Sequence, residues 1–266
     1  MSASQASSTH LVLMPSFDTG RKLVETVTEA RAQWTPVWVV IDGSTDGTAE
    51  QMQALAERDP GLRVFVLPVN QGKGAAVLHG LRAASAAGFT YALTMDADGQ
   101  HPTELIPSFM QASIERAISQ PRREAMILGK PVFDASAPLL RVRGRKVSNG
   151  WTQLETLGAG IGDSLYGFRV YPIAPLIRVM ARQPWMRRFD FDTEAVVRLA
   201  WRGVKPINID APVKYLSAEE GGVSHFRYGR DNVLLTWMHL RLMLEFVLRL
   251  PMLVWLRLTG RPPFQP

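Results

Sequence analysis

The sequence predicts an α/β fold with a mostly parallel sheet and helices on both faces, and three observations support this. Short apolar runs alternate with segments of helical pattern from residue 11 to residue 129. The run 37–41 carries almost nothing polar, as is typical of a central strand covered on both sides. Several runs end abruptly in polar residues, where the carboxyl ends of such strands bind ligands. The length of 266 residues and the 46% hydrophobic content permit a large core.

The elements follow from these patterns in order. We expect strands at 11–14, 37–41, 64–67 and 89–95, with helices at 21–33, 48–58 and 75–87 between them. Further along we expect a strand at 126–129, a helix at about 145–157, a strand at 163–171, a helix at 192–202 and an extended segment at 204–216.

The chain divides into three parts on this basis. Residues 1–9 are a polar segment without the basic region and apolar stretch of a signal peptide, so the main domain is expected to stay in the cytosol. Residues 10–232 form the α/β domain. Residues 233–266 form an amphipathic helical tail.

The tail has an unusual composition for a terminal helix. It is rich in Leu, Val and Trp, while Arg241, Glu245 and Arg249 recur four residues apart and Pro251 is expected to break the helix. Three charges and a proline argue against a membrane-spanning helix. A wide apolar face fits a helix lying on the membrane surface, and packing on the domain's own core fits equally well.

Composition excludes some functions. The chain has no cysteine, which rules out disulfides, thiolate zinc sites and cysteine nucleophiles. A net charge of +6 favours anionic partners such as nucleotides or phospholipids. Nucleic acid is not expected as a partner, because no recognition motif is present and Lys and Arg are dispersed along the chain.

The stretch 93–102 carries the strongest chemical signal. An apolar run ends in Asp96 and Asp98, two carboxylates one residue apart, followed by Gln100. Hard oxygen ligands at the end of a buried strand suit Mg²⁺ or Mn²⁺, and Gln100 adds a neutral oxygen. The alternative is a polar turn before a helix that starts near Pro102.

Two glycine loops point to the same edge of the sheet. The segment 42–48 and the segment 70–74 each follow a strand and open a helix, an arrangement that holds phosphate oxygens. Asp42 is a candidate for contact with a ribose or base, and Lys73 for contact with a phosphate, although a solvated lysine is the commoner outcome. A metal clamped on a leaving diphosphate acts as a Lewis acid and requires no protein proton donor.

These stretches together resemble a known family. Asp42-Gly-Ser-Thr-Asp-Gly-Thr48, Asn70-Gln-Gly-Lys-Gly-Ala-Ala76 and Met95-Asp-Ala-Asp-Gly-Gln-His-Pro102 resemble segments of family 2 glycosyltransferases with the GT-A fold, as do Ser164-Leu-Tyr-Gly-Phe-Arg169 and Phe191-Asp-Thr-Glu194. The resemblance covers about residues 11–231. It is greatest to the subgroup of dolichyl-phosphate mannose synthase and the bacterial polyprenyl-phosphate glycosyltransferases.

The resemblance implies transfer of a sugar, with inversion, from a nucleoside diphosphate (NDP) sugar to a lipid-linked acceptor. The acceptor would be a polyprenyl phosphate or glycolipid at the inner face of the cytoplasmic membrane. By resemblance, Pro15 and Phe17 line the base pocket and Asp42 contacts the nucleoside. Lys73 and Asp96 join the nucleotide-sugar site, and Asp96, Asp98 and Gln100 hold Mg²⁺ or Mn²⁺.

On the acceptor side, the resemblance places Arg141 and Arg145 against an acceptor phosphate, a ligand that arginine forks suit well. A solvated basic helix face is nearly as good an explanation for that cluster. Arg169 is a candidate for a buried functional arginine. His225 and Arg227 follow the glycine pair at 221–222, and we expect them to touch the donor diphosphate or the acceptor phosphate; a merely solvated histidine is the alternative.

A general base is needed only for some acceptors. A phosphate monoester is already ionised near neutrality, whereas a hydroxyl acceptor must lose a proton. Asp192 and Glu194 are the candidate bases, with Asp163 a distant third. Because residues two apart on a helix point in different directions, at most one of the two should reach the reaction centre. We favour Asp192 as the base. The alternative is that Asp192 only caps the N-terminus of the helix.

Two departures from the family pattern leave a second hypothesis open. The chain has Ile41-Asp42 where the family has paired aspartates, and Pro15-Ser16-Phe17-Asp18-Thr19 where the family has Pro-x-Tyr-Asn-Glu. Both lie in the nucleoside pocket, so an NDP-sugar-binding protein with weak or no transferase activity is the alternative. A nucleotidyltransferase is disfavoured, since residues 15–20 lack its glycine-rich basic loop.

Overall fold

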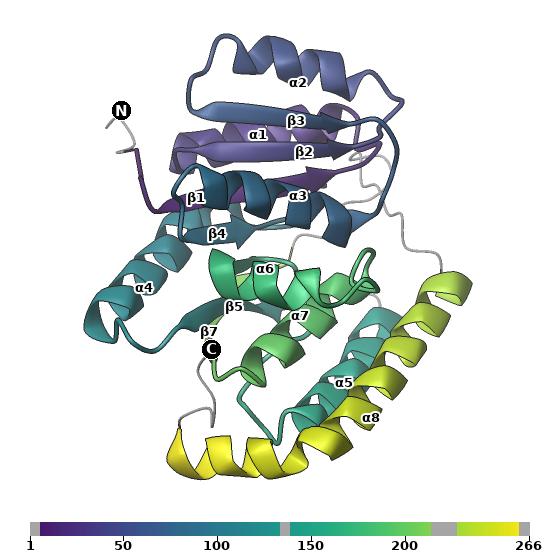
Figure 1. Cartoon of the computed structure of the whole chain (residues 1–266). Coiled ribbons are helices and arrows are strands. Elements are labelled where there is room, and N and C mark those ends of the chain that lie inside the picture. Colours follow the sequence, from purple (N-terminus) through teal and green to yellow (C-terminus); the bar gives the residue numbers. More distant parts are fainter. Residues whose placement is uncertain (1–5, 134–138, 214–227, 261–266) are drawn as a thin grey trace.

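The computed structural model describes residues 6–133, 139–213 and 228–260, and of these the side chains of 139–141 and 228 are not described. One seven-stranded sheet has the strand order β3-β2-β1-β4-β6-β5-β7 (Figure 1). The strands are β1 (His10–Ser16), β2 (Val37–Asp42), β3 (Leu62–Leu67), β4 (Tyr91–Thr94), β5 (Ala125–Val132), β6 (Arg169–Pro172) and β7 (Lys205–Pro212). Strand β6 runs antiparallel to β4 and β5, and every other neighbouring pair is parallel.

Helices cover both faces of this sheet, as expected. The helices are α1 (Arg21–Gln33), α2 (Thr48–Ala56), α3 (Lys73–Ala86), α4 (Ile106–Ser119), α5 (Leu139–Glu155), α6 (Ile173–Ala181), α7 (Asp190–Ala200) and α8 (Tyr228–Thr259), with a 3₁₀ turn η1 (Thr103–Leu105) before α4. Alternate side chains of β1 point to opposite faces: Val12 packs with α1 and α4, while Leu13 packs with α3, α6 and α7.

The reversed strand β6 brings a distant loop to the carboxyl edge of the sheet. Thr94, the last residue of β4, pairs with Arg169, the first residue of β6. The loop before β6 therefore ends where β4 delivers Asp96. The expected strand 163–171 is confined to 169–172, because Asp163 Oδ1 accepts hydrogen bonds from the amides of Leu165 (2.9 Å) and Tyr166 (2.7 Å) and turns the chain.

Helix α8 does not end at Pro251 as expected. Pro251 lies inside one helix that runs from Tyr228 to Thr259, and Figure 1 shows this helix bent in its C-terminal part. Proline removes one backbone hydrogen bond and pushes on the preceding turn, which bends a helix when neighbouring turns hold it. Helix α5 likewise begins at Leu139, ahead of the expected residue 145.

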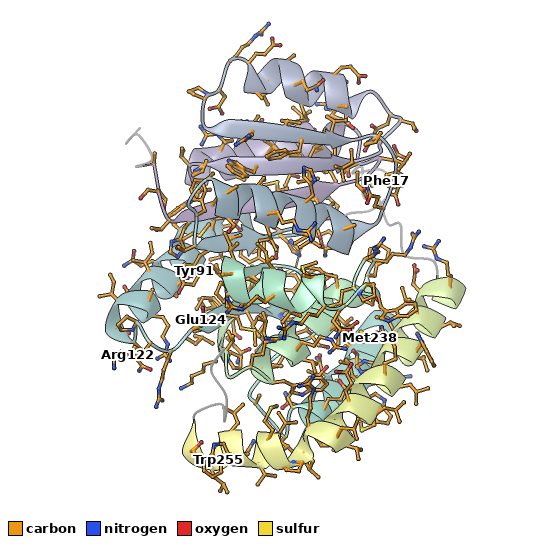
Figure 2. All side chains as sticks on the ribbon, in the orientation of Figure 1. Phe17, Tyr91, Arg122, Glu124, Met238 and Trp255 are labelled. Atoms are coloured by element: carbon orange, nitrogen blue, oxygen red, sulfur yellow. The ribbon has the colours of Figure 1, made fainter. Side chains whose placement is uncertain are left out.

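Helix α8 has two apolar faces, so both sequence interpretations describe part of it. The inner face packs against Val197 and Trp201 of α7 and consists of Met238, Leu242, Phe246 and Leu253; Figure 2 labels Met238 on this side. The outer face is exposed and consists of Val233, Trp237, Leu240, Leu244, Val247, Leu248, Val254, Trp255 and Leu258. Among the described helices, none is long and apolar enough to cross a membrane.

Candidate functional site

The carboxyl edge of the sheet gathers the polar residues that follow parallel strands. Pro15 and Phe17 lie at the end of β1, Asp42 ends β2, and Asp96 and Asp98 follow β4. Pro15 is buried and Phe17 is half-buried at this edge, where Figure 2 labels it. The edge is the location that the sequence predicts for a nucleotide and a metal.

Asp42 binds the glycine loop that precedes α3. Its two carboxylate oxygens accept hydrogen bonds from the amides of Gln71 (2.9 Å) and Gly72 (2.7 Å). The side chain is 2% exposed, and burial raises its pKa despite these bonds. Gly43, with φ of +70°, permits the close approach, because a Cβ there would lie 2.3 Å from the amide of Asn70. Asp42 thus fixes the loop that presents Lys73.

Lys73 is the centre of the site. Its Nζ lies 2.7 Å from Asp96 Oδ1 and 2.7 Å from Asp192 Oδ2, so α3, the segment after β4 and α7 meet at one ammonium group. Burial alone would lower the pKa of Lys73, but the charges of Asp192 and Asp96 raise it, so the side chain stays protonated. Asp192 keeps its other oxygen, Oδ1, buried without a hydrogen-bond partner among the described residues.

Asp96 is held as a carboxylate by its neighbours. Burial favours its protonated form, yet Lys73 and His101 keep the pKa of Asp96 below its usual value. The backbone amide of Asp96 donates to His101 Nδ1 (2.9 Å), and His101 Nε2 lies 3.8 Å from Asp96 Oδ2. Burial lowers the pKa of His101 to about 4, so the ring is neutral and its proton is on Nε2, facing the carboxylate.

Sequence reasoning assigned no role to His101, Tyr166 or Gly167, which complete the lining. The Tyr166 ring packs edge-on against His101, with ring centres 4.7 Å apart. A Cβ on Gly167 would lie 2.9 Å from Lys73 Nζ and 3.2 Å from Asp96 Oδ2. A larger residue would therefore displace the Lys73–Asp96 ion pair, and the glycine was already present in the Gly-Phe-Arg segment.

Asp98 and Gln100 lie beside Asp96, half-buried. Asp98 Oδ1 accepts a hydrogen bond from the amide of Gln100 (3.0 Å). Burial and the neighbouring Asp96 raise the pKa of Asp98 to about 7. In the described part of the chain, no three acidic, His or Cys side chains converge as a ready-made metal site. Two carboxylates close enough to disturb each other still fit Mg²⁺ or Mn²⁺, which take one or two carboxylates and complete their shell with water and substrate phosphates.

The acceptor-side arginines lie at different depths. Arg169 is fully buried; it donates to the backbone carbonyls of Asp192 and Asp163 and to the Tyr171 hydroxyl, so it holds α7 in place and does not face solvent. Arg145 lies nearer the surface and pairs with Asp163 (2.7 Å). The side chain of Arg141 and all of His225 and Arg227 lie outside the described residues.

Glu194 does not join this group. It is fully buried on the other side of α7, where its carboxylate pairs with Arg198 (2.7 Å) and Arg241 (3.2 Å). Asp192 and Glu194 thus point in different directions, and the structure brings only Asp192 to Lys73.

Comparison with known proteins agrees with this geometry. Residues 11–129 match the family described as Glycosyl transferase family 2. An undecaprenyl-phosphate mannosyltransferase of Micrococcus luteus is 24% identical over 188 residues, 70% of this chain and 73% of that protein. A dolichol-phosphate mannosyltransferase of Saccharomyces cerevisiae is 33% identical over 110 residues, 41% of this chain and 39% of that protein.

Among solved structures, residues 1–349 of S. aureus TarS in complex with UDP-GlcNAc superpose with a TM-score of 0.51 at 13% identity. That match covers 86% of this chain and 65% of the TarS chain, and at this identity it bears on the fold alone. Residues 11–129 therefore carry the match to the family 2 glycosyltransferases, within a chain that has the GT-A fold, and the matches to the family and to these mannosyltransferases support a glycosyltransferase.

Proposed function

We propose that this enzyme transfers a hexose, with inversion and with Mg²⁺ or Mn²⁺, from an NDP-sugar to a polyprenyl phosphate. The observation that supports this most is the meeting of Lys73, Asp96 and Asp192 beside Asp98 at the carboxyl edge of a family 2 domain. The names of the relatives favour mannose as the sugar and a polyprenyl phosphate as the acceptor.

The donor would lie along this edge. Asp98, with Asp96 and Gln100, would hold the metal ion, which supplies Lewis acidity to the departing diphosphate when bound. Pro15 and Phe17 would line the base pocket at the end of β1. Asp42 would act mainly through the loop that it fixes, because both of its oxygens already accept backbone hydrogen bonds.

The reaction with a phosphate acceptor needs no protein base. An acceptor phosphate oxygen attacks the anomeric carbon, the bond from that carbon to the diphosphate breaks, and the nucleoside diphosphate leaves with the electron pair. Since a phosphate monoester is already ionised near neutrality, no proton has to be removed. Arg145, which pairs with Asp163, would attract the acceptor phosphate, and Arg141, His225 and Arg227 are candidates for the same role.

Asp192 would face the reacting groups. Lys73 binds its Oδ2, and the buried Oδ1 has no hydrogen-bond partner among the described residues, so Oδ1 is the oxygen that would bind a substrate hydroxyl or sugar once a ligand opens the site. We assign Glu194 a structural role, since its carboxylate is enclosed by Arg198 and Arg241.

The outer face of α8 would lie on the inner surface of the cytoplasmic membrane. Between residues 232 and 256 the charged residues of this helix are Arg241, Glu245 and Arg249, and all three form ion pairs on the inner side. The exposed side is therefore an uncharged apolar strip, a surface that soluble proteins rarely leave in water. Residues 10–232 would then be the catalytic domain and 233–266 the lipid-binding tail.

A donor screen tests the proposal. Purified protein is incubated with a panel of UDP- and GDP-hexoses, Mg²⁺ or Mn²⁺, and vesicles with or without undecaprenyl phosphate, and nucleoside diphosphate release is measured. We expect release that requires both metal and lipid phosphate. Tight donor binding with no transfer to any lipid phosphate would instead favour the binding-protein alternative.

A further inference from the structure

The contact between α7 and α8 contains a chain of alternating charges. Arg241 pairs with Glu194, Glu194 with Arg198, and Arg198 with Glu245, at distances of 3.2, 2.7 and 2.6 Å respectively. Arg249 pairs with Glu245 at 3.4 Å at the outer end. Glu194 has no exposed surface and the side chain of Arg198 is 5% exposed, so most of this chain is shielded from solvent.

Arg241 reaches two segments that frame the site. It pairs with Glu194, two residues after Asp192 on α7. Its guanidinium also lies 5.6 Å from the centre of the Trp185 ring, in the segment between α6 and α7. The carbonyl of Arg187 in that same segment accepts the amides of Gly74 (2.9 Å) and Ala75 (3.3 Å) at the start of α3, beside Lys73.

These contacts join the lipid-facing helix to both partners of the Lys73–Asp192 ion pair. We propose that Glu194 and Arg241 are positioning residues that couple the seating of α8 on a lipid surface to the placement of Asp192 against Lys73. The inference rests on the lipid contact proposed above and assigns to Glu194 a role other than base.

The two faces of α8 explain how lipid binding could affect the placement of Asp192. Its inner side holds the ion pairs, while its outer side exposes a long uncharged apolar strip to water in the free protein. A lipid surface that covers this strip restrains α8 along its length. Because Arg241 is bound to α7 by a shielded charge pair, restraint of α8 restrains the first turn of α7 as well.

Glu194 and Arg241 act by positioning Asp192, because neither side chain reaches the side of α7 that faces Lys73. Among the described residues, Glu194 forms ion pairs with Arg198 of α7 and Arg241 of α8, on the side of α7 opposite to Asp192. Loss of the coupling should therefore remove the response to lipid and leave the site itself assembled.

Amide hydrogen exchange measured by mass spectrometry tests this without relying on turnover. The full chain is compared alone and with vesicles of phosphatidylglycerol and phosphatidylethanolamine, following residues 183–193. Arg241→Gln is the test variant. Arg241→Lys retains the charge as a rescue, and Arg249→Gln is the matched control from the same ion-pair chain.

In the wild type we expect vesicles to slow exchange in this segment by about fivefold or more, the lower range of coupling between sites. Arg241→Gln should bind vesicles as the wild type does but lose this protection, while Arg249→Gln and Arg241→Lys keep it. Thermal unfolding of Arg241→Gln checks that it is folded. If it is not, the double variant Glu194→Gln/Arg241→Gln, which leaves no unpaired charge at that contact, takes its place.

The inference is overturned if Arg241→Gln retains full protection, or if wild-type vesicle binding leaves residues 183–193 unchanged. If the wild type does not bind vesicles at all, the lipid contact of the proposed function fails together with this coupling. Metal-dependent donor turnover is scored separately in the donor screen, so failure of the coupling and failure of the transferase proposal give different results.

Discussion

Two regions of the molecule are each built around ion pairs between acidic and basic side chains, but they differ in charge balance. At the carboxyl edge of the sheet, Asp96 and Asp192 share the ammonium group of Lys73, and Asp98 lies beside Asp96 with no ion pair to any described residue. At the contact between α7 and α8, acidic and basic side chains alternate, and each carboxylate has two guanidinium neighbours. The first region has an excess of negative charge, and the second neutralises its own carboxylates.

This difference separates a binding site from an internal support. Neighbouring carboxylates at an accessible edge are stabilised by a cation, and at Asp98 burial first and then the charge of Asp96 raise the pKa. Paired charges that are shielded from water mainly fix the relative position of the elements that carry them. Asp192 and Glu194 show the contrast within one helix turn, because one faces each region.

The largest expected effect is at the edge. Asp98→Ala should lower turnover with Mg²⁺ or Mn²⁺ by about 10²–10³-fold, the scale of losing one strong electrostatic contact in a transition state. Steady-state release of nucleoside diphosphate measures this. Asp210→Asn is the matched control, because that carboxylate is exposed and its ion pair is with Lys130 of β5 rather than with Lys73. Full turnover by Asp98→Ala would remove the metal role from this residue.

The next effect tests how tightly the edge is packed. Gly167→Ala places a methyl group 2.9 Å from Lys73 Nζ, so the ion pair must shift. We expect kcat/KM to fall by about 10–100-fold, because small misplacements of catalytic groups are costly. Gly150→Ala in α5 meets no neighbouring atom within 4 Å and should keep wild-type activity. Equal kinetics for both variants would show that the edge tolerates rearrangement.

The two faces of α8 can be compared within a single turn. Leu242 is fully buried and Leu244 is 62% exposed. Leu242→Ala should lower the free energy of unfolding by about 2–5 kcal/mol, whereas Leu244→Ala should change it by less than about 0.5 kcal/mol. Urea unfolding measures both variants. In vesicle sedimentation the order of the two effects should be reversed, with Leu244→Ala binding vesicles more weakly than Leu242→Ala. Equal effects of the two variants in either assay would contradict the description of α8 as a helix with one buried and one exposed apolar face.

The smallest effect concerns Asp190, which lies between the two regions. Burial raises its pKa to about 6, and Oδ2 has no hydrogen-bond partner among the described residues. A folded pKa above the unfolded value favours the folded state at low pH, and this advantage is lost as pH rises through about 6. Compared with Asp190→Asn, the wild type should lose about 1–2 kcal/mol of stability between pH 4 and pH 7. Parallel pH profiles of the unfolding free energy would contradict this.

The sequence predicted the edge well because parallel strands deliver their following residues to one side. The strand before Asp96 and the loops after Asp42 and Val69 were recognisable from apolar runs and glycines. The contribution of Tyr166 and Gly167 was not, because it depends on β6 running against its neighbours. No local pattern indicates that reversal, which arises from pairing between Thr94 and Arg169, 75 residues apart. The contribution of His101 was missed as well, because it depends on how the turn after β4 brings its ring to the Asp96 amide.

In the tail, the sequence could not predict which face of α8 is buried. Leu, Val and Trp cover most of α8, so the apolar pattern alone could not decide which face is buried. The spacing of Arg241, Glu245 and Arg249 does mark a stripe, but a stripe of charges normally faces water. Here it faces Glu194 and Arg198, and only the tertiary arrangement reveals those partners.

Binding of Mn²⁺ tests whether Asp98 holds a metal ion beside the donor diphosphate, and the experiment needs no knowledge of the acceptor. Electron paramagnetic resonance would follow free Mn²⁺ during titration of the protein with UDP or GDP present. We expect the wild type to bind Mn²⁺ when either UDP or GDP is present. Asp98→Ala should abolish this Mn²⁺ binding, whereas Asp210→Asn should bind Mn²⁺ as the wild type does. Wild-type binding of Mn²⁺ by Asp98→Ala would contradict the assignment of the metal and diphosphate to this edge.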